Sequence, residues 1–237
     1  MPPYEEVFLA AEDDDDEKVR DFVENRGVPA NATNEHEITL AHVASRKGNL
    51  NLVKYILEKD LSILTDKKCR GEEVFNLAIK YGHLHVVKYL VETLNQPIEK
   101  RFSNRFSGNT PIHQAVEYEY LHVLKYFLEE RNGDVNILSD VQQTPVFIAV
   151  ENRNLTLTKY LIEERGADVN RVDYRSDTLL DKAADRDDFD MLRYLIGERK
   201  IKAPRTWKED QMHQVATFNR LPLMKYLVGE LHAKVNV

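Results

Sequence analysis

Apolar residues recur along this chain in a phrase built around a basic residue followed by tyrosine. The pair occurs six times, at intervals of 34, 37, 34, 34 and 32 residues. The six copies are Lys54-Tyr55, Lys88-Tyr89, Lys125-Tyr126, Lys159-Tyr160, Arg193-Tyr194 and Lys225-Tyr226. Asp21-Phe22 lies 33 residues before the first pair and is an eroded seventh copy. Self-similarity at a period near 34 residues predicts a stack of small helical units rather than one globular core.

The residues around each pair predict an amphipathic helix. Apolar positions follow one another at spacings of three, three and four residues, which place them on one stripe of a helix. The first stripe position is held by Leu50, Leu84, Leu121, Leu155, Phe189 and Leu221, and the second by Val53, Val87, Leu124, Thr158, Leu192 and Met224. The stripe continues in pairs such as Ile56-Leu57 and Leu161-Ile162. One unit cannot bury such a stripe alone, so neighbouring units must cover it.

A second signal begins 15 residues before each basic residue and predicts an earlier helix in each unit. A polar first residue suits a helix cap, and proline at the next position suits the first turn. The segments are Thr39-Leu40-Ala41-His42, Glu73-Val74-Phe75-Asn76, Thr110-Pro111-Ile112-His113, Thr144-Pro145-Val146-Phe147, Thr178-Leu179-Leu180-Asp181 and Asp210-Gln211-Met212-His213. They resemble the T-P-L-H start of ankyrin repeats. Gly48-Asn49-Leu50 and Gly82-His83-Leu84 resemble the central turn of that family, and Asp134-Val135-Asn136 and Asp168-Val169-Asn170 resemble its ending.

The resemblance implies an all-α ankyrin-repeat solenoid, in which helix–turn–helix units are joined by short β-turn or hairpin-like loops. It covers essentially the whole chain and predicts a single domain over residues 1–237. The expected repeats are approximately 2–31 (an N-terminal cap), 32–67, 68–104, 105–138, 139–172, 173–204 and 205–237. The divergent array resembles family members that act as host-directed effectors. Another family trait is hydroxylation of the asparagine in the ending motif, here Asn136 and Asn170.

The two ends of the array differ in polarity. In the first copy, Glu17, Arg20 and Glu24 occupy stripe positions, which predicts a solvated cap. Its turn, Asp13 to Asp16, is interpreted as part of that cap, with a cation or basic-peptide site as the alternative. The last copy keeps an apolar stripe up to Val228. This predicts further repeats or a domain after Val237, or dimerisation, unless long side chains cover the stripe.

Composition narrows the function further. The 237 residues are 42% hydrophobic and 31% charged, and no apolar run approaches the roughly 18 residues of a membrane span. No signal peptide is visible, and the single cysteine, Cys69, excludes an internal disulfide and fits a reducing compartment, so we expect a cytoplasmic or nuclear protein. A net charge of −7 argues against nucleic-acid binding, which needs a basic face.

The sequence does not predict an enzyme. It lacks the G-x-S-x-G nucleophile elbow, the phosphate-binding loop and the dinucleotide glycine loop. His42, His113 and His213 fall at the structural histidine position that the resemblance implies, and His85 and His122 are expected on the surface. Scattered histidines and one cysteine do not supply the four convergent ligands of a zinc site. We therefore expect no catalytic residues, no cofactor and no metal.

Candidate partner-binding residues follow from the position of the groove in ankyrin-like stacks, which is formed by loop tips and the first helix of each unit. Many of them are aromatic or arginine, the side chains that dominate interface hot spots. The candidates are Arg46, Lys47, Lys80, Tyr81, Arg101, Arg105, Phe106, Tyr118, Tyr174, Arg175, Trp207 and Phe218. Three of these belong to loop 99–109, which carries a three-residue insertion. The alternatives are local packing of the aromatics and a tolerated surface insertion.

The favoured function is a protein-interaction module that binds a partner protein or peptide in a groove spanning copies two to seven. One alternative is the recognition arm of a larger effector or enzyme, and another is a stand-alone enzyme inhibitor. The tyrosine of each basic–tyrosine pair is interpreted as part of the scaffold, because it repeats so regularly.

Overall fold

A computed structural model of the protein describes residues 3–65, 73–102, 108–202, 207, 211 and 220–231. The regular secondary structure of these residues is helical, and one isolated antiparallel bridge joins Thr33 and Thr39. The predicted all-α fold class is therefore confirmed. The chain forms two compact units, Met1–Asp134 and Val135–Val237. The single domain and the count of seven repeats stay predictions.

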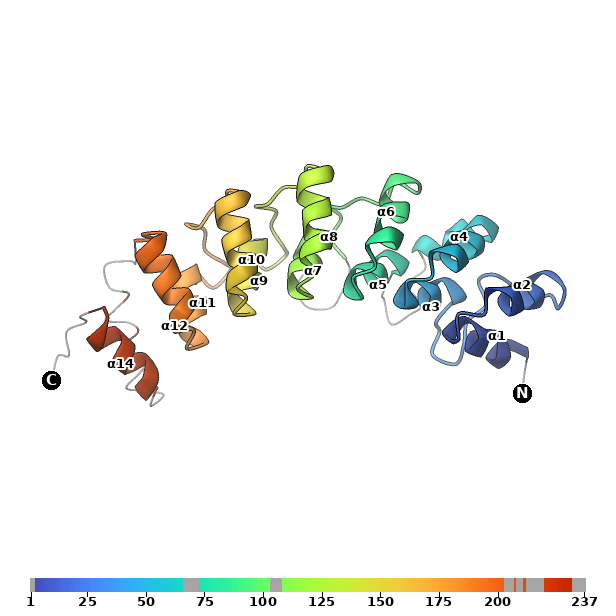
Figure 1. Ribbon diagram of the computed structural model, residues 1–237, viewed down its shortest axis with the longest axis horizontal. Coiled ribbons are helices and arrows are strands. Elements are labelled where there is room, and N and C mark those ends of the chain that lie inside the picture. The colour runs from blue at the N-terminus through green and yellow to red at the C-terminus, as the bar shows by residue number, and fades with distance from the viewer. Residues whose placement is uncertain are drawn as a thin grey trace. The chain divides into compact units, whose positions relative to one another are not determined.

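The described residues of the first unit form four helix pairs (Figure 1). Their bounds are α1 (Pro3–Glu12) and α2 (Asp16–Glu24), α3 (Leu40–Lys47) and α4 (Leu50–Lys59), α5 (Val74–Lys80) and α6 (Leu84–Glu92), and α7 (Pro111–Glu117) and α8 (Leu121–Lys125). A short 3₁₀ helix, η1 (Leu61–Thr65), follows α4, and a π-helical turn, η2 (Tyr126–Glu130), extends α8. The first helices pack on one another in chain order, α1 on α3, α3 on α5 and α5 on α7, so each pair covers the next.

The second unit repeats this arrangement. Its described helices are α9 (Pro145–Glu151), α10 (Leu155–Lys159) with the π-helical turn η3 (Tyr160–Glu164), α11 (Leu179–Asp185), α12 (Phe189–Leu192) with the π-helical turn η4 (Arg193–Glu198), and α14 (Leu221–Gly229). Helix α9 packs against both α10 and α11, and α11 packs against α12 (Figure 1).

Local chemistry explains where the first helices begin. The Thr110 hydroxyl lies 2.9 Å from Nδ1 of His113, so the histidine of the T-P-L-H segment closes the first turn of α7. The carboxylate of Asp181 does the same work in α11, because it accepts hydrogen bonds from the backbone N–H and the hydroxyl of Thr178 at 2.8 and 2.7 Å. Both arrangements satisfy a donor that the helix itself leaves unpaired.

The predicted stripe of the second helices is buried from its second position onward, at Val53, Val87, Leu124, Thr158 and Leu192, but its first position is not. The first predicted position is the first residue of each helix, and it is half-buried at Leu50, Leu84, Leu121, Leu155 and Phe189 and exposed at Leu221. The side chains two residues later are fully buried, at Leu52, Val86, Val123, Leu157, Met191 and Leu223. The expectation of a buried first position is therefore wrong. The reason is geometric, because a first helical residue lies at the rim of the stack, where the neighbouring pair covers only part of it.

The two ends of the array keep the polarity that the sequence predicted. Glu17, Arg20 and Glu24 of α2 are exposed, which confirms the polar face of the first copy. In α14, Leu221, Met224 and Val228 are exposed.

Candidate interaction surfaces

Three described loops before first helices, 34–38, 139–143 and 173–177, form short fingers that are each closed by a polar side chain. In the finger 173–177, Oδ1 of Asp173 accepts hydrogen bonds from the backbone N–H groups of Arg175 (2.9 Å) and Asp177 (3.1 Å). The backbone N–H of Asp173 donates to the carbonyl of Asp177 at 3.1 Å, and Ser176 takes a positive φ of 68°. Asn34 and Ser139 close the fingers 34–38 and 139–143 in the same way. The fingertips are therefore held by their own backbones.

The finger 173–177 is also anchored to α11 by a buried ammonium group. Nζ of Lys182 lies 2.8 Å from Asp173, 2.9 Å from Asp177 and 3.5 Å from Glu151 of α9. Burial opposes the charge on Lys182, but the hydrogen bonds to Asp173 and Asp177 outweigh it and raise the pKa of the ammonium. Burial likewise raises the pKa of Asp173, yet Lys182 and the two backbone donors bring that pKa below its ordinary value. Both groups are therefore charged at neutral pH, and the ion pair fixes the finger.

The tip of this finger presents an aromatic ring and a guanidinium group to solvent. Tyr174 is 53% exposed. Nε of Arg175 donates to its hydroxyl at 2.6 Å, and the guanidinium carbon lies 5.2 Å from the centre of its ring. The backbone N–H of Tyr174 donates to the carbonyl of Val141 in the preceding finger at 3.2 Å. Tyr174 and Arg175 thus form one fixed surface element.

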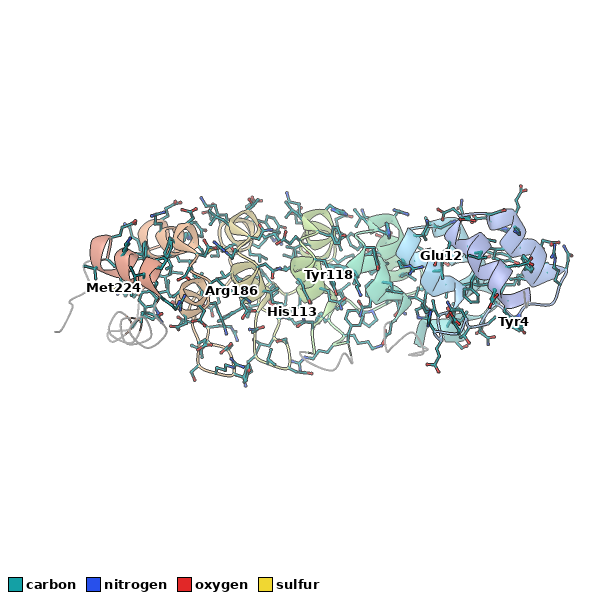
Figure 2. All side chains as sticks on the ribbon, turned by 90° about the horizontal axis from the view of Figure 1, so that it is seen from below. Tyr4, Glu12, His113, Tyr118, Arg186 and Met224 are labelled. Carbon is teal, nitrogen blue, oxygen red and sulfur yellow. The ribbon has the colours of Figure 1, made fainter. Side chains whose placement is uncertain are left out.

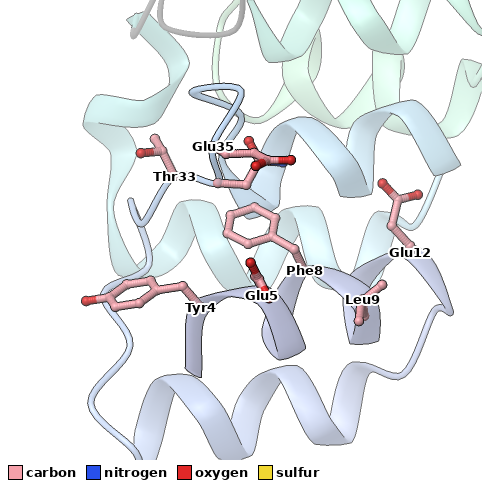
Figure 3. A pocket seen from close by; sticks show the side chains of 8 residues that line it. Tyr4, Glu5, Phe8, Leu9, Glu12, Thr33 and Glu35 are labelled. Atoms are coloured by element: carbon pink, nitrogen blue, oxygen red, sulfur yellow. The ribbon is translucent and has the colours of Figure 1, made fainter. Parts of the chain in front are cut away.

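A hollow of about 720 Å³ lies on the outer side of α1, beneath the finger 34–38. Tyr4, Glu5, Phe8, Leu9 and Glu12 of α1 line one side, and Thr33, Asn34 and Glu35 line the other. Figure 3 shows the ring of Phe8 pointing from α1 toward Thr33 and Glu35. Sequence reasoning missed this site because it treated the first copy as a cap. The available signal was Leu9, an apolar residue in a copy that was interpreted as a polar cap, and it is 53% exposed.

Comparison with known families decides the classification. A family model described as ankyrin repeats (3 copies) matches overlapping segments at residues 7–101, 42–139, 91–173 and 112–207. The chain belongs to the ankyrin-repeat family. The family predicted from the T-P-L-H segments is thus confirmed.

Two relatives of this ankyrin-repeat protein are informative. It is 32% identical over 75 residues to the 26S proteasome non-ATPase regulatory subunit 10 of Dictyostelium discoideum, and the match spans 32% of each chain. It also resembles one chain of the structure of a predatory endopeptidase from Bdellovibrio bacteriovorus in complex with an immunity protein. That likeness has a TM-score of 0.67 and 23% identity, and covers 83% of this chain and 97% of the other. At such low identity it shows the fold alone.

The positive charges of the basic candidates in the second repeat are already paired with carboxylates of this chain. Arg46 forms an ion pair with Glu12, and Nζ of Lys47 lies 3.5 Å from Asp14. Both acidic partners belong to α1 and the turn that follows it, so the first repeat offsets the positive charges of the second. The acidic turn thus makes internal ion pairs. Lys80 is half-buried and Arg101 is exposed.

Two tyrosine candidates, Tyr81 and Tyr118, lie where first helices end. Tyr81, just after α5, is exposed and stacks on His83, with ring centres 6.4 Å apart and an angle of 13° between the planes. Tyr118, labelled in Figure 2, follows α7 directly. It is half-buried. His85 and His122 are exposed, as predicted, and their Nε2 atoms lie 2.6 and 2.9 Å from the carbonyls of Gly48 and Gly82. These histidines therefore help to join successive repeats of the first unit.

Trp207 corrects the sequence-based expectation of a surface aromatic. It is only 2% exposed, and its Nε1–H donates to Oδ1 of Asp181 at 2.8 Å. Asp181 replaces the histidine of the T-P-L-H segment. One of its oxygens caps α11 through Thr178, and the other holds the indole. The tryptophan is thus a packing residue. Arg105, Phe106 and Phe218 lie outside the described residues.

Other site types find no support in the part of the chain that the structure describes. No helix there is long and apolar enough to cross a membrane. Among the same residues, no group of three or more His, Cys, Asp or Glu is placed to hold a metal ion. The described surface instead offers exposed tyrosine and arginine side chains, exposed apolar side chains such as Leu61 and Leu221, and the hollow over α1.

Proposed function

We propose that this ankyrin-repeat protein is an interaction module that binds a partner protein or peptide on its fingers and first helices, without chemistry of its own. The observation that carries the proposal is the fixed Tyr174–Arg175 element at the tip of the finger 173–177. Membership in a family of interaction modules supports it. The module would act in a reducing compartment, the cytoplasm or the nucleus.

The physical argument is one of pre-organisation. Tyrosine and arginine side chains, when buried at an interface, contribute about 2 kcal/mol or more each. Ordering a mobile loop and its side chains on binding would offset part of that gain, by roughly 0.5–1.5 kcal/mol for each long side chain. Here the hydrogen bonds of Asp173 and the ion pair with Lys182 fix the backbone before a partner arrives. The side chains of Tyr174 and Arg175 are exposed and are joined by a surface hydrogen bond, so the ordering that is avoided on binding is mainly that of the backbone.

The test compares the wild-type protein with the double variant Tyr174→Ala, Arg175→Ala. Partners are captured from cells of the source organism, identified by mass spectrometry and then measured as purified proteins by calorimetry. We expect the double variant to bind at least 30-fold more weakly, since about 2 kcal/mol corresponds to that ratio. Arg199→Ala, at an exposed position after η4, is the control and should bind normally. Equal affinity of wild type and double variant for every purified partner would refute a role for this fingertip.

The identity of the partner separates two narrower versions of this function. If a captured hydrolase or kinase loses activity on binding, the protein is an enzyme inhibitor. If the native transcript continues after Val237 into a catalytic domain, the array is the recognition arm of a larger effector or enzyme. The exposed apolar residues of α14, Leu221, Met224 and Val228, motivate the second version.

A further inference from the structure

We propose that the hollow over α1 docks a basic segment of a partner protein, with one apolar side chain of that segment seated on Leu9 and Phe8. The inference rests on the proposed function and adds a second contact site on this protein, with the chemistry of the partner segment that it would bind. It differs from the fingertip element in that it lies wholly within the first unit.

The floor of the hollow is apolar and partly open to solvent. Leu9 is 53% exposed and Tyr4 is 43% exposed, whereas Phe8 between them is almost buried. The remaining apolar side chains of α1 face the core, and Val7 and Ala11 are fully covered. Leu9 and Tyr4 therefore leave about half of their surface in contact with water. Covering them with an apolar side chain of a partner would remove their surface from water and favour binding.

The rim of the hollow is acidic. It is lined by the carboxylates of Glu5, Glu12 and Glu35. Glu12 forms an ion pair with Arg46. Glu35 is exposed, and one of its oxygens lies 3.4 Å from Nε2 of His36. Three carboxylates against one guanidinium leave a negative potential, which is strengthened by the net charge of −7 of the whole chain. A segment with lysine or arginine around its apolar residue complements this rim, and an acidic segment meets like charges.

The walls of the hollow are fixed in advance. On one side is the helix α1, which packs against α2 and α3. On the other side, Oδ1 of Asn34 accepts hydrogen bonds from the backbone N–H groups of His36 (2.9 Å) and Ile38 (3.0 Å), and the bridge between Thr33 and Thr39 closes the loop. The volume, about 720 Å³, lies within the range of about 300–1,000 Å³ that is usual for binding pockets. The site can therefore accept an extended segment without reordering its own backbone.

The experiment uses three fluorescently labelled peptides and fluorescence anisotropy on the full chain. The first carries a central leucine flanked on both sides by lysine and arginine, the second replaces the basic residues with glutamate, and the third replaces the leucine with alanine. We expect only the first to bind below about 1 mM, with an affinity that falls as salt rises. Leu9→Ala should weaken binding by about tenfold. The double variant Glu5→Gln, Glu35→Gln should weaken it several-fold and flatten its salt dependence.

Matched controls lie elsewhere in the first unit. Leu61 of η1 is 57% exposed and Glu58 of α4 is exposed, so Leu61→Ala and Glu58→Gln remove similar groups away from the hollow and should bind the first peptide as wild type does. Equal binding of the acidic peptide would overturn the inference. So would unchanged affinity in Leu9→Ala, absence of binding by the basic peptide, or self-association of the chain that Leu9→Ala abolishes.

The outcome is separable from that of the proposed function. If a captured partner depends on Tyr174 and Arg175 while the basic peptide does not bind, only the inference about the hollow fails. If the basic peptide binds in a manner that depends on Leu9 and Glu35 while the fingertip variant captures every partner normally, the hollow stands and the fingertip proposal fails.

Discussion

Replacing Lys182 with methionine should destabilise the finger 173–177 and helix α11, because it leaves the buried carboxylate of Asp173 without its countercharge. Breaking a buried ion pair from one side generally costs about 3–5 kcal/mol. Here the penalty is smaller, because Asp173 keeps the backbone donors of Arg175 and Asp177. The Asp177 carboxylate is partly exposed and can be solvated. We therefore expect a loss of about 2–3 kcal/mol in the free energy of unfolding of this region.

The assay must resolve the second unit, because contacts in a repeat protein run between neighbours and the two units need not unfold together. Hydrogen exchange of peptides covering residues 173–185, read by mass spectrometry, gives the local free energy of unfolding. Urea unfolding followed by circular dichroism gives the free energy of unfolding of the whole chain. Methionine is chosen because its length resembles that of lysine, which avoids a cavity. Lys159→Met is the control. Its ammonium lies 3.6 Å from Glu198 at a half-exposed position, so its loss should stay below about 1 kcal/mol.

A second substitution separates charge from packing. Asparagine at position 173 keeps an oxygen for the backbone donors but removes the negative charge, so Asp173→Asn combined with Lys182→Met should recover most of the lost stability.

The charge on Asp173 also makes the stability of this region depend on pH. The pKa of Asp173 is lowered in the folded state, so its contribution is present above the unfolded value of about 3.9 and is lost as the pH falls through the lower folded value. The variant Asp173→Asn should lack this loss.

Two results would refute this account of the finger. The first is Lys182→Met with wild-type exchange rates in residues 173–185. The second is a double variant no more stable than Lys182→Met alone, because that outcome would mean that packing, not the ion pair, holds the finger.

Three further predictions concern the scaffold. Leu124→Ala should lower the free energy of unfolding by about 2–5 kcal/mol, whereas Leu121→Ala, half-buried in the same helix, should lower it by about 1 kcal/mol; equal losses in urea titrations would contradict the buried register. Gly48→Ala should destabilise more than Gly27→Ala in the same titrations. Both glycines have positive φ, 80° and 70°, but a Cβ on Gly48 would lie 2.5 Å from the ring of His83, whereas a Cβ on Gly27 would meet nothing within 4 Å. Equal losses of stability in the two variants would show that the ring of His83 moves freely. Burial and a hydrogen bond to a glutamate raise the pKa of Tyr55 from 10.0 to about 12, so the stability that Tyr55 contributes is full below about pH 10 and is lost as the pH rises through 12. Tyr55→Phe should therefore make the melting temperature depend less on pH over that range. An unchanged dependence of the melting temperature on pH would count against this prediction.

The interaction surface was only partly visible in the sequence. Tyr174 and Arg175 were identified from their position before the start of a repeat, and both are exposed. Trp207 met the same positional criterion and is buried, because Asp181 offers a second carboxylate oxygen where three other repeats carry histidine. Arg46 and Lys47 met it too, but their charges are balanced by Glu12 and Asp14, which lie more than 30 residues earlier in the chain. The position of a residue within its repeat thus predicts where its backbone lies. It does not predict which residues of the neighbouring repeat contact its side chain.

By itself the sequence determined the repeat period, the order of the helices and their capping, because each depends on residues within a few positions of one another. It also determined the family, through segments that recur in register. Only the tertiary structure decided where the buried stripe begins, since Leu121 and Val123 differ in exposure according to how far the next helix pair extends over them. It alone revealed the hollow over α1, because Leu9 and Glu35 come together only when the first finger folds back over the first helix.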